Sequence, residues 1–298
     1  MTDAERAARL RDAARRAPAT VDLEELGPHL AADSIEARAR ALETLGRLAL
    51  AGRDVESYAD RLDRCYGDRD LLDAPVRLST ERDSEAWVQP RALAFAVAAL
   101  ALTGAVDRGD AIRSAVNAYE NQHPEFDAEM RTNTAIREVG WGFASVVIFT
   151  DGYVDVILSL VDRDDATVRR VGASALSDVA EEYAPVRDEY PDETPRLVAD
   201  AAERLATDPH PRVRYHAAFA LTEYAMDRPE LVRPRADVLS AALRDEAALV
   251  RKEAAATLGF VGATDAVPAL RDLAETDPDE RVREAAADAR ESLESERE

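Results

Sequence analysis

Residues 208–221 read DPHPRVRYHAAFAL, and this stretch decides the fold because it returns twice with the same spacing. The two further copies are DEAALVRKEAAATL at 245–258 and DPDERVREAAADAR at 277–290. Looser copies keep the dipeptide that ends in arginine and the small residues after it; they are VRRVGASAL at 168–176, IREVGWGFA at 136–144 and ARARALETL at 37–45. Self-similarity at a period of tens of residues is typical of stacked repeats.

Each unit reads as two helices separated by a short break. In the last unit, apolar residues recur at helical spacing over 265–275, Asp277-Pro278 interrupts the chain, and a second helix follows over 280–293. The same pattern predicts five more pairs: 23–30 with 35–51, 110–121 with 126–149, 153–161 with 166–183, 194–206 with 211–225, and 229–243 with 247–261. Another second helix, predicted over 85–103, brings the total to about seven units.

The regularity of the pattern divides the chain into three parts. Residues 1–19 are predicted to form an N-terminal capping helix, in which Thr2 and Glu5 have the spacing of a capping box. Residues 20–150 hold diverged repeats with an irregular loop near 67–84, and residues 151–298 hold regular repeats that end in an acidic C-terminal cap. Terminal repeats need such polar caps because their outer faces have no neighbour.

The composition is acidic and poor in aromatic residues. Of 298 residues 46% are hydrophobic but only 5% aromatic, the net charge is −22, and Lys252 is the only lysine. Salt screens the repulsion within a carboxylate-dense surface. The composition therefore predicts a salt-rich cytoplasm and a halophilic archaeal source.

Several features favour a cytoplasmic location. A single cysteine, Cys65, allows no intramolecular disulfide, and the first ten residues carry charges instead of the apolar core of a signal peptide. The longest apolar run, ALAFAVAALAL at 92–102, is too short to cross a bilayer and is predicted to be a helix buried between neighbours.

The repeated motif resembles HEAT repeats, specifically the phycobilin-lyase-like type. This resemblance implies an all-α fold, a right-handed α–α superhelix of about seven HEAT-like helix pairs. It also implies a structural ladder between neighbouring units, made by Asp208, Arg214, Asp245, Arg251, Asp277 and Arg283. The aspartate precedes the arginine by six positions in these three units but by five in the Asp164/Arg169 pair, which puts the ladder there in doubt.

The sequence contains none of the common catalytic or metal-binding motifs. No histidine is followed by glutamate, which excludes the di-iron hydroxylases among HEAT-repeat proteins, and no P-loop or G-x-S-x-G motif is present. Cys65 is predicted to be a buried, inert thiol. No catalytic residue, metal ligand or cofactor is therefore assigned, and the chain is expected not to be an enzyme.

The favoured function is a scaffold or adaptor that binds an unidentified protein along the concave face of the solenoid. The irregular segment 117–141 is either the binding surface or only a diverged repeat. The candidate contact residues in and before it are Trp87, Arg91, Arg131, Asn133, Arg137 and Trp141.

Two alternatives belong to other classes. A HEAT-like fold also occurs in alkylpurine DNA glycosylases, and clustering of Arg91, Arg131 and Arg137 would support a nucleic-acid-binding role that the acidic charge otherwise disfavours. The phycobilin-lyase-like label allows a lyase or chaperone-like accessory role, for which Cys65 is the only thiol available. Membrane insertion is not expected, and the sequence does not determine the oligomeric state.

Overall fold

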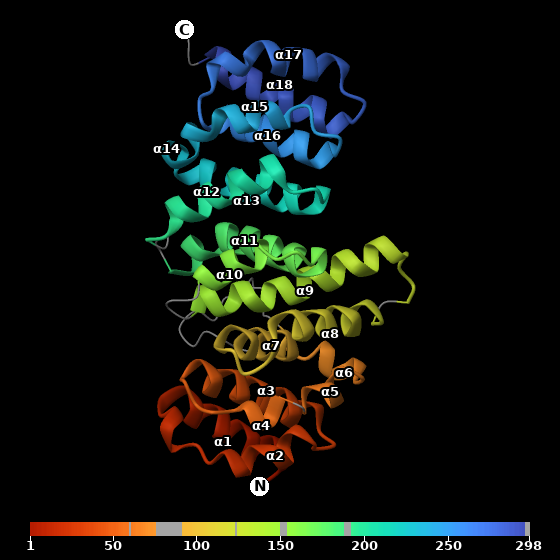
Figure 1. The fold of residues 1–298 in the computed structure, drawn as a ribbon, viewed down its shortest axis with the longest axis vertical. Helices are drawn as coiled ribbons and strands as arrows, with labels where there is room; N and C mark the ends of the chain where they lie inside the picture. The colour runs from red at the N-terminus through yellow and green to blue at the C-terminus, as the bar shows by residue number, and fades with distance from the viewer. Residues whose placement is uncertain (60, 76–90, 123, 150–153, 188–191, 296–298) are drawn as a thin grey trace. The chain divides into compact units, whose positions relative to one another are not determined.

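A computed structural model describes residues 1–59, 61–75, 91–122, 124–149, 154–187 and 192–295. The chain divides into two compact units, Met1–Ala175 and Leu176–Glu298, which are described separately. Apart from one isolated bridge between Pro75 and Arg91, the described residues contain helices, turns and loops but no β-structure. The fold is an all-α solenoid of repeated helix pairs (Figure 1).

The first unit contains the helices up to the first part of α11. They are α1 (Asp3–Arg16), η1 (Pro18–Thr20), α2 (Leu23–Leu30), α3 (Ile35–Leu50), α4 (Glu56–Ala59), α5 (Leu62–Cys65), α6 (Arg69–Leu72), α7 (Ala92–Thr103), α8 (Arg108–Glu120), α9 (Ala128–Phe149), α10 (Val154–Val161) and α11 (Ala166–Arg187). Within this unit, α3, α7 and α9 are second helices that pack against one another in sequence order.

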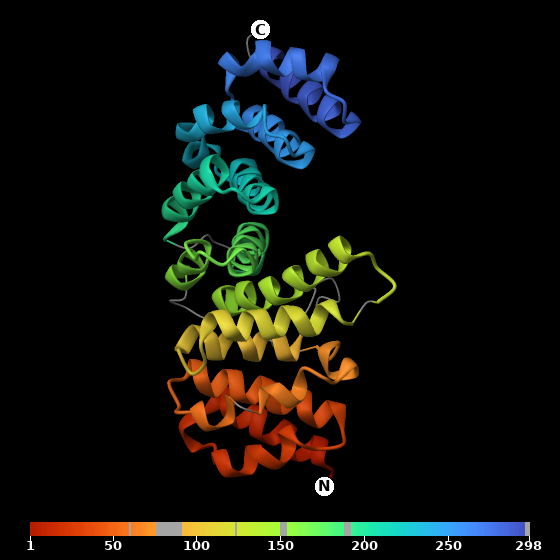
Figure 2. The ribbon, with the colours of Figure 1, turned by 45° about the vertical axis from the view of Figure 1, so that its right-hand side comes forward.

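The second unit contains the rest of α11 and three further pairs, whose stacking can be followed in Figure 2. They are built from α12 (Thr194–Thr207), α13 (Pro211–Asp227), α14 (Pro229–Val232), η2 (Arg233–Arg235), α15 (Ala236–Ala242), α16 (Ala248–Phe260), η3 (Thr264–Ala266), α17 (Val267–Thr276) and α18 (Glu280–Ser295). Helices α13, α16 and α18 form one layer, and α12, α15 and α17 pack against it.

Most predicted helix boundaries hold to within a few residues, and one predicted helix is broken. The predicted helix 229–243 is divided into α14, η2 and α15. Pro234 lies in the middle of this segment, and a proline there has no N–H to donate and clashes with the preceding turn. The predicted helix over 85–103 begins at Ala92 in the described part, and residues 85–90 lie outside it.

The N-terminal helix has the predicted cap. The Thr2 hydroxyl accepts from the Glu5 backbone N–H at 3.2 Å, and the Glu5 carboxylate accepts from the Thr2 N–H at 2.7 Å. These bonds confirm the capping box. Helix α1 packs on α3 and buries Ala7, Leu10 and Ala14.

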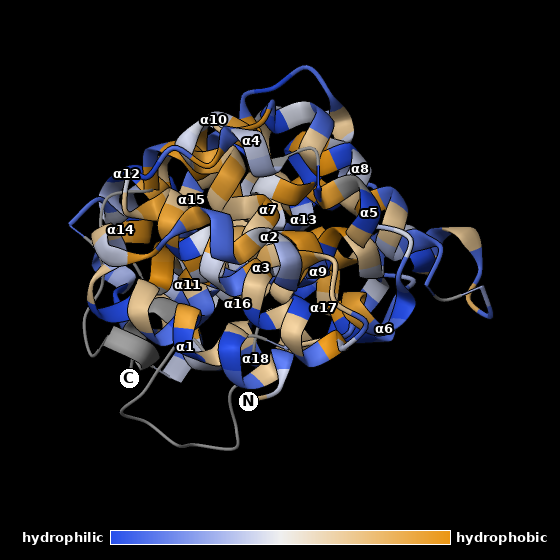
Figure 3. Ribbon diagram, turned by 90° about the horizontal axis from the view of Figure 1, so that it is seen from below, coloured by the Kyte–Doolittle hydropathy of each residue, from blue (hydrophilic) through white to orange (hydrophobic). Residues whose placement is uncertain are grey.

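Small residues let the second helices approach closely. Helix α7 is buried on every side, as predicted, whereas α18 exposes charged residues between its buried positions. Figure 3 colours the helices by hydropathy and shows hydrophobic and hydrophilic residues alternating along them. A Cβ atom added to Gly142 in α9 would lie 2.6 Å from the carbonyl carbon and oxygen of Ala94 in α7. Glycine at 142 is therefore required by backbone contact. In the described part of the chain, no helix is both long and apolar enough to traverse a lipid bilayer.

Candidate interaction surface

Arg214 and Asp245 join neighbouring repeats of the second unit through a bidentate ion pair. Arg214 Nε donates to Asp245 Oδ2 at 2.7 Å and Nη2 donates to Oδ1 at 3.0 Å. The same guanidinium donates back to the Asp208 carbonyl at 3.0 Å. A bidentate pair fixes both distance and orientation, so this arginine sets how one repeat sits on the next.

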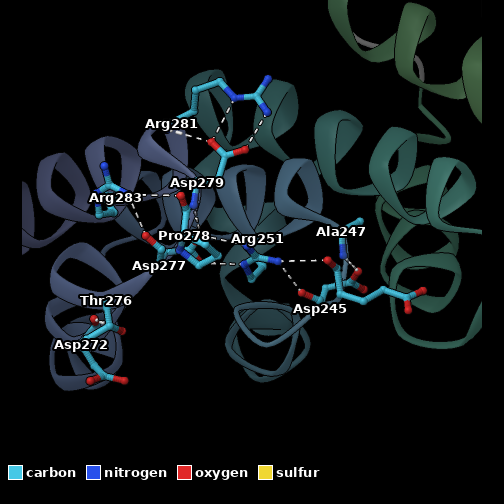
Figure 4. A network of polar contacts seen from close by, with 11 residues as sticks. Asp245, Ala247, Arg251, Asp272, Thr276, Asp277, Pro278, Asp279, Arg281 and Arg283 are labelled. Carbon is cyan, nitrogen blue, oxygen red and sulfur yellow. Dashed lines mark hydrogen bonds and ion pairs between the residues drawn. The ribbon is translucent and has the colours of Figure 1, made fainter. Parts of the chain in front are cut away.

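Arg251 repeats this arrangement one unit later (Figure 4). It donates to the Asp277 carboxylate at 2.7 and 2.8 Å and to the Asp245 carbonyl at 2.8 Å. Arg283 donates in turn to the Asp277 carbonyl at 2.8 Å. The hydrogen bond from Arg251 is the main reason that the pKa of Asp277 lies below its usual range.

Each ladder aspartate also holds the turn before its own second helix. The Asp208, Asp245 and Asp277 carboxylates each accept the backbone N–H two residues later, at 2.8 to 2.9 Å. The Asp245 and Asp277 carboxylates, 11% and 3% exposed, each accept both from a ladder arginine and from a backbone N–H. We therefore assign the ladder residues a structural role.

Each arginine–aspartate pair between neighbouring repeats is one rung of the ladder. The described part of the first unit has such a rung near its start but none between the repeats of α9 and α11. Arg38 pairs with Asp68 at 2.5 Å. Arg169 donates to the carbonyl of Arg163 at 3.0 Å, six positions earlier, just as Arg214 donates to Asp208. Position 163 therefore corresponds to the ladder aspartate, and Arg163 stands there instead of Asp164.

This substitution leaves the preceding ladder arginine, Arg137, without its counter-charge. Arg137 is exposed and makes no ion pair with any residue that the structure describes. Asp165 instead pairs with Arg113 at 2.7 Å and accepts the Thr167 N–H at 2.8 Å. The doubt raised by the Asp164/Arg169 spacing thus has a physical basis in the charge at position 163.

Replacing Arg163 with aspartate is expected to stabilise the first unit by about 0.5–1 kcal/mol, because it removes a like charge and offers a partner to Arg137. Chemical unfolding in low salt measures the change. The gain should vanish in the Arg137→Ala background. Equal stabilisation in both backgrounds would show that no rung forms.

The described members of the predicted contact set are placed as follows. Arg91 donates to the Asp73 carbonyl at 2.8 Å and lies 3.5 Å from the Glu138 carboxylate. On α9, Asn133 accepts from Arg170 at 2.8 Å, whereas Trp141 is half-buried and Arg131 partly exposed. Trp87 lies outside the described residues.

Helical geometry also separates these residues. Asn133, Arg137 and Trp141 follow one another four residues apart and share one side of α9. Arg131 is six residues before Arg137, so it points to another side of the helix. With Arg91 held by acidic partners, the described arginines of this region form no continuous cationic surface.

Two other features seen in the sequence are occupied by packing. Cys65 is 2% exposed, and burial raises the pKa of its thiol to about 11, so it stays protonated near neutral pH. His216 is partly buried, and its Nδ1 lies 3.0 Å from the Ser177 hydroxyl, so this ring takes part in the packing of α11 against α13. No group of residues able to hold a metal ion occurs in the described ranges.

A surface that the sequence did not single out lies on the second-helix layer of the second unit. We name Glu181, Glu182, Tyr215, Phe219, Glu223 and Glu253 the carboxylate–aromatic strip, in which Glu253 forms the buried edge at 4% exposure. Tyr215, Phe219 and Glu223 follow one another four residues apart on α13, so they form one row. The rings of Tyr215 and Phe219 lie 6.2 Å apart, and both side chains are partly exposed.

Helices on both sides supply the other carboxylates. The Ser177–His216 contact places the end of α11, with Glu181 and Glu182, beside α13. On the opposite side, Thr222 lies 2.8 Å from Thr257 and 3.3 Å from the Glu253 carboxylate of α16. The strip therefore crosses three neighbouring helices.

The strip carries more negative charge than its surroundings compensate. Lys252 pairs with Glu253 at 2.8 Å. Within the described ranges, no ion pair neutralises Glu181, Glu182 or Glu223. Burial raises the pKa of Glu223, and the charge of Glu181 raises it further. Like charges held together on a surface favour a cation.

Superposition of the repeats on their ladder arginines could have revealed this surface. The position after the arginine is Arg170, Tyr215, Lys252 or Glu284, and four residues further it is Ser174, Phe219, Ala256 or Asp288. Both positions vary between repeats, and the residues on either side of the second position are small in every copy. Variation at fixed positions of a repeat marks the side chains that packing does not determine.

Comparisons with known proteins support the fold assignment. Residues 198–290 match the family model described as HEAT repeats, and no curated protein matches the sequence significantly. A solved structure of an engineered protein is 22% identical over 99% of this chain and 79% of that chain, with a TM-score of 0.43.

Two further solved structures show the same level of likeness. A designed armadillo repeat protein in complex with the peptide (KR)4 is 16% identical over 91% of this chain and 99% of that chain, with a TM-score of 0.46. A Kap121p mutant is 16% identical over 96% of this chain but only 29% of that chain, with a TM-score of 0.45. Because these TM-scores lie below 0.5, the fold assignment rests on the family match and on the helix pairing.

Proposed function

We propose that this chain is a non-catalytic scaffold that binds a protein partner on the second-helix layer of residues 176–298. The carrying observation is that this layer exposes aromatic side chains beside carboxylates that form no ion pair with any described residue, whereas the ladder is used internally. Stacked helix pairs present extended surfaces suited to such binding.

Exposed apolar side chains on the same unit support this proposal. Phe260 at the end of α16 is 47% exposed, and Met226 at the end of α13 is 56% exposed. Phe260 occupies the position in its repeat that Glu223 occupies in the preceding one. Large apolar residues gathered on one layer are typical of protein interaction sites.

Ancestry and environment are inferred from the sequence pattern. We propose a phycobilin-lyase-like type of HEAT repeat, supported by the Asp…Val-Arg spacing, and a halophilic archaeal source, supported by the net charge of −22. The repeat type assigns no activity, because function depends on the residues that a fold presents.

A photo-crosslinking residue placed at position 219 tests the scaffold function. In a lysate of the source cells at their native salt, this position should give a discrete protein adduct. The matched control carries the same residue at Asp237, which is exposed on α15 in the other layer. Absence of an adduct at position 219, or identical adducts at both positions, would contradict the proposal.

A further inference from the structure

The strip contains both aromatic and acidic side chains, and this combination restricts the chemical class of partner that can bind there. It combines an aromatic pair, Tyr215 and Phe219, with carboxylates contributed by α11, α13 and α16. Two cations lie nearby: Lys252 is paired with Glu253, and Arg212 interacts electrostatically with Tyr215. A purely apolar partner would leave Glu223 desolvated without compensation, which is unfavourable.

We propose that the strip receives an extended, arginine-rich segment of a partner protein. This inference rests on the proposed scaffold function and specifies its partner chemistry. Guanidinium groups can donate to the Glu181, Glu182 and Glu223 carboxylates in pairs of hydrogen bonds. They can also stack on the Tyr215 and Phe219 rings, which an ammonium group does less well.

The dimensions of the layer set the length of the segment. Packed helices lie about 8–10 Å apart, so the path from α11 across α13 to α16 is about 20 Å long. An extended chain advances about 3.3 Å per residue, so about six residues cover this path. Arginines at alternate positions of such a segment would point to the same face and meet successive helices.

Desolvation explains why the contact would be specific and not only a response to the negative net charge. Burial and the charge of Glu181 together raise the pKa of both Glu182 and Glu223. A bound cation relieves this unfavourable energy, whereas a cation at a fully solvated carboxylate gains little. Removing the strip carboxylates should therefore weaken binding more than removing the same number of exposed ones.

The test titrates the full chain into a fluorescent peptide of about ten residues with arginine and serine alternating, in about 0.15 M salt. The strip variant is Glu181→Gln/Glu182→Gln/Glu223→Gln. The matched control, Glu203→Gln/Asp237→Asn/Asp272→Asn, removes three exposed charges from α12, α15 and α17. We expect the strip variant to weaken binding about tenfold and the control to change it less than about twofold.

A second variant and a second peptide separate the contribution of aromatic stacking from that of the guanidinium charge. Phe219→Ala should weaken binding about fivefold through loss of stacking, and a peptide with citrulline in place of arginine should not bind. Equal weakening by the two triple variants would overturn the proposal, as would equal binding of the citrulline peptide. If wild type binds no arginine peptide while position 219 still crosslinks to a partner, the basic segment is wrong and the scaffold function stands.

Discussion

Replacing Arg251 with alanine is expected to destabilise the last two repeats by about 3 kcal/mol, because it leaves a buried carboxylate without its counter-charge. The Asp277 side chain is 3% exposed and accepts two hydrogen bonds from Arg251. The variant also loses the bond from Arg251 to the Asp245 carbonyl. Chemical unfolding, together with amide exchange over α16–α18, measures the loss.

The matched control is Arg281→Ala. Arg281 also forms an ion pair with an aspartate, Asp279, at 2.7 Å, but its side chain is 61% exposed. An exposed pair contributes at most about 1 kcal/mol, so this variant should be nearly neutral. If both variants lose the same stability, the ladder adds nothing beyond ordinary surface charge pairing.

The dependence on pH has a definite sign. The folded protein lowers the pKa of Asp277, so the ion pair contributes stability above the unfolded pKa, near 4. That contribution is lost as the pH falls through the lower, folded pKa. The difference in unfolding free energy between wild type and Arg251→Ala should therefore shrink below about pH 4.

The sequence was sufficient to predict most of the fold, because one local pattern carries both the helix starts and the packing face. Val213 and Ala217 lie four residues apart and are both buried, so the motif itself specifies which side of α13 faces its neighbours. The break in 229–243 was missed because the apolar stripe continues across Pro234. The spacing of apolar residues carries no information about the backbone N–H that a proline lacks.

The candidate surface was harder to predict because it depends on contacts between units. Glu181 and Glu253 are 72 positions apart in the sequence (253 − 181), yet both influence the pKa of Glu223. Nothing local distinguishes these glutamates from the many solvated acids of the chain. The polar variety of 117–141 suggests a surface there instead, but Asn133 of that segment and Arg91 before it both contact neighbouring side chains.

Contacts between helices also determine the surroundings of a buried carboxylate on α3, which packs against α1. Glu43, 2% exposed, forms an ion pair with Arg47 at 2.8 Å. The charges of Arg11 and Arg15 also act on Glu43. The first helix holds five arginines, but only the packing reveals that the charges of two of them act on a buried carboxylate of α3.

Substituting Gly142 with alanine is expected to destabilise the first unit by about 2–3 kcal/mol, because the added methyl group would meet backbone atoms that cannot rotate away. The new Cβ would lie 2.6 Å from the carbonyl carbon and oxygen of Ala94 and 3.0 Å from its Cβ. Helices α7 and α9 would have to separate. Thermal and chemical unfolding of the variant measure the effect.

Gly109→Ala is the control that separates this contact from intrinsic helix propensity. Gly109 is also helical, but an added Cβ would meet only side-chain atoms, the flexible guanidinium of Arg113 at 3.2 Å and the Asp107 carboxylate at 3.4 Å. Alanine is favoured over glycine in a helix by up to about 1 kcal/mol, so this change should be neutral or stabilising. The same gain in helix propensity applies at position 142. If Gly142→Ala lowers the free energy of unfolding while Gly109→Ala does not, the difference gives the cost of separating α7 from α9. Equal effects would show that the two helices do not require glycine at their contact.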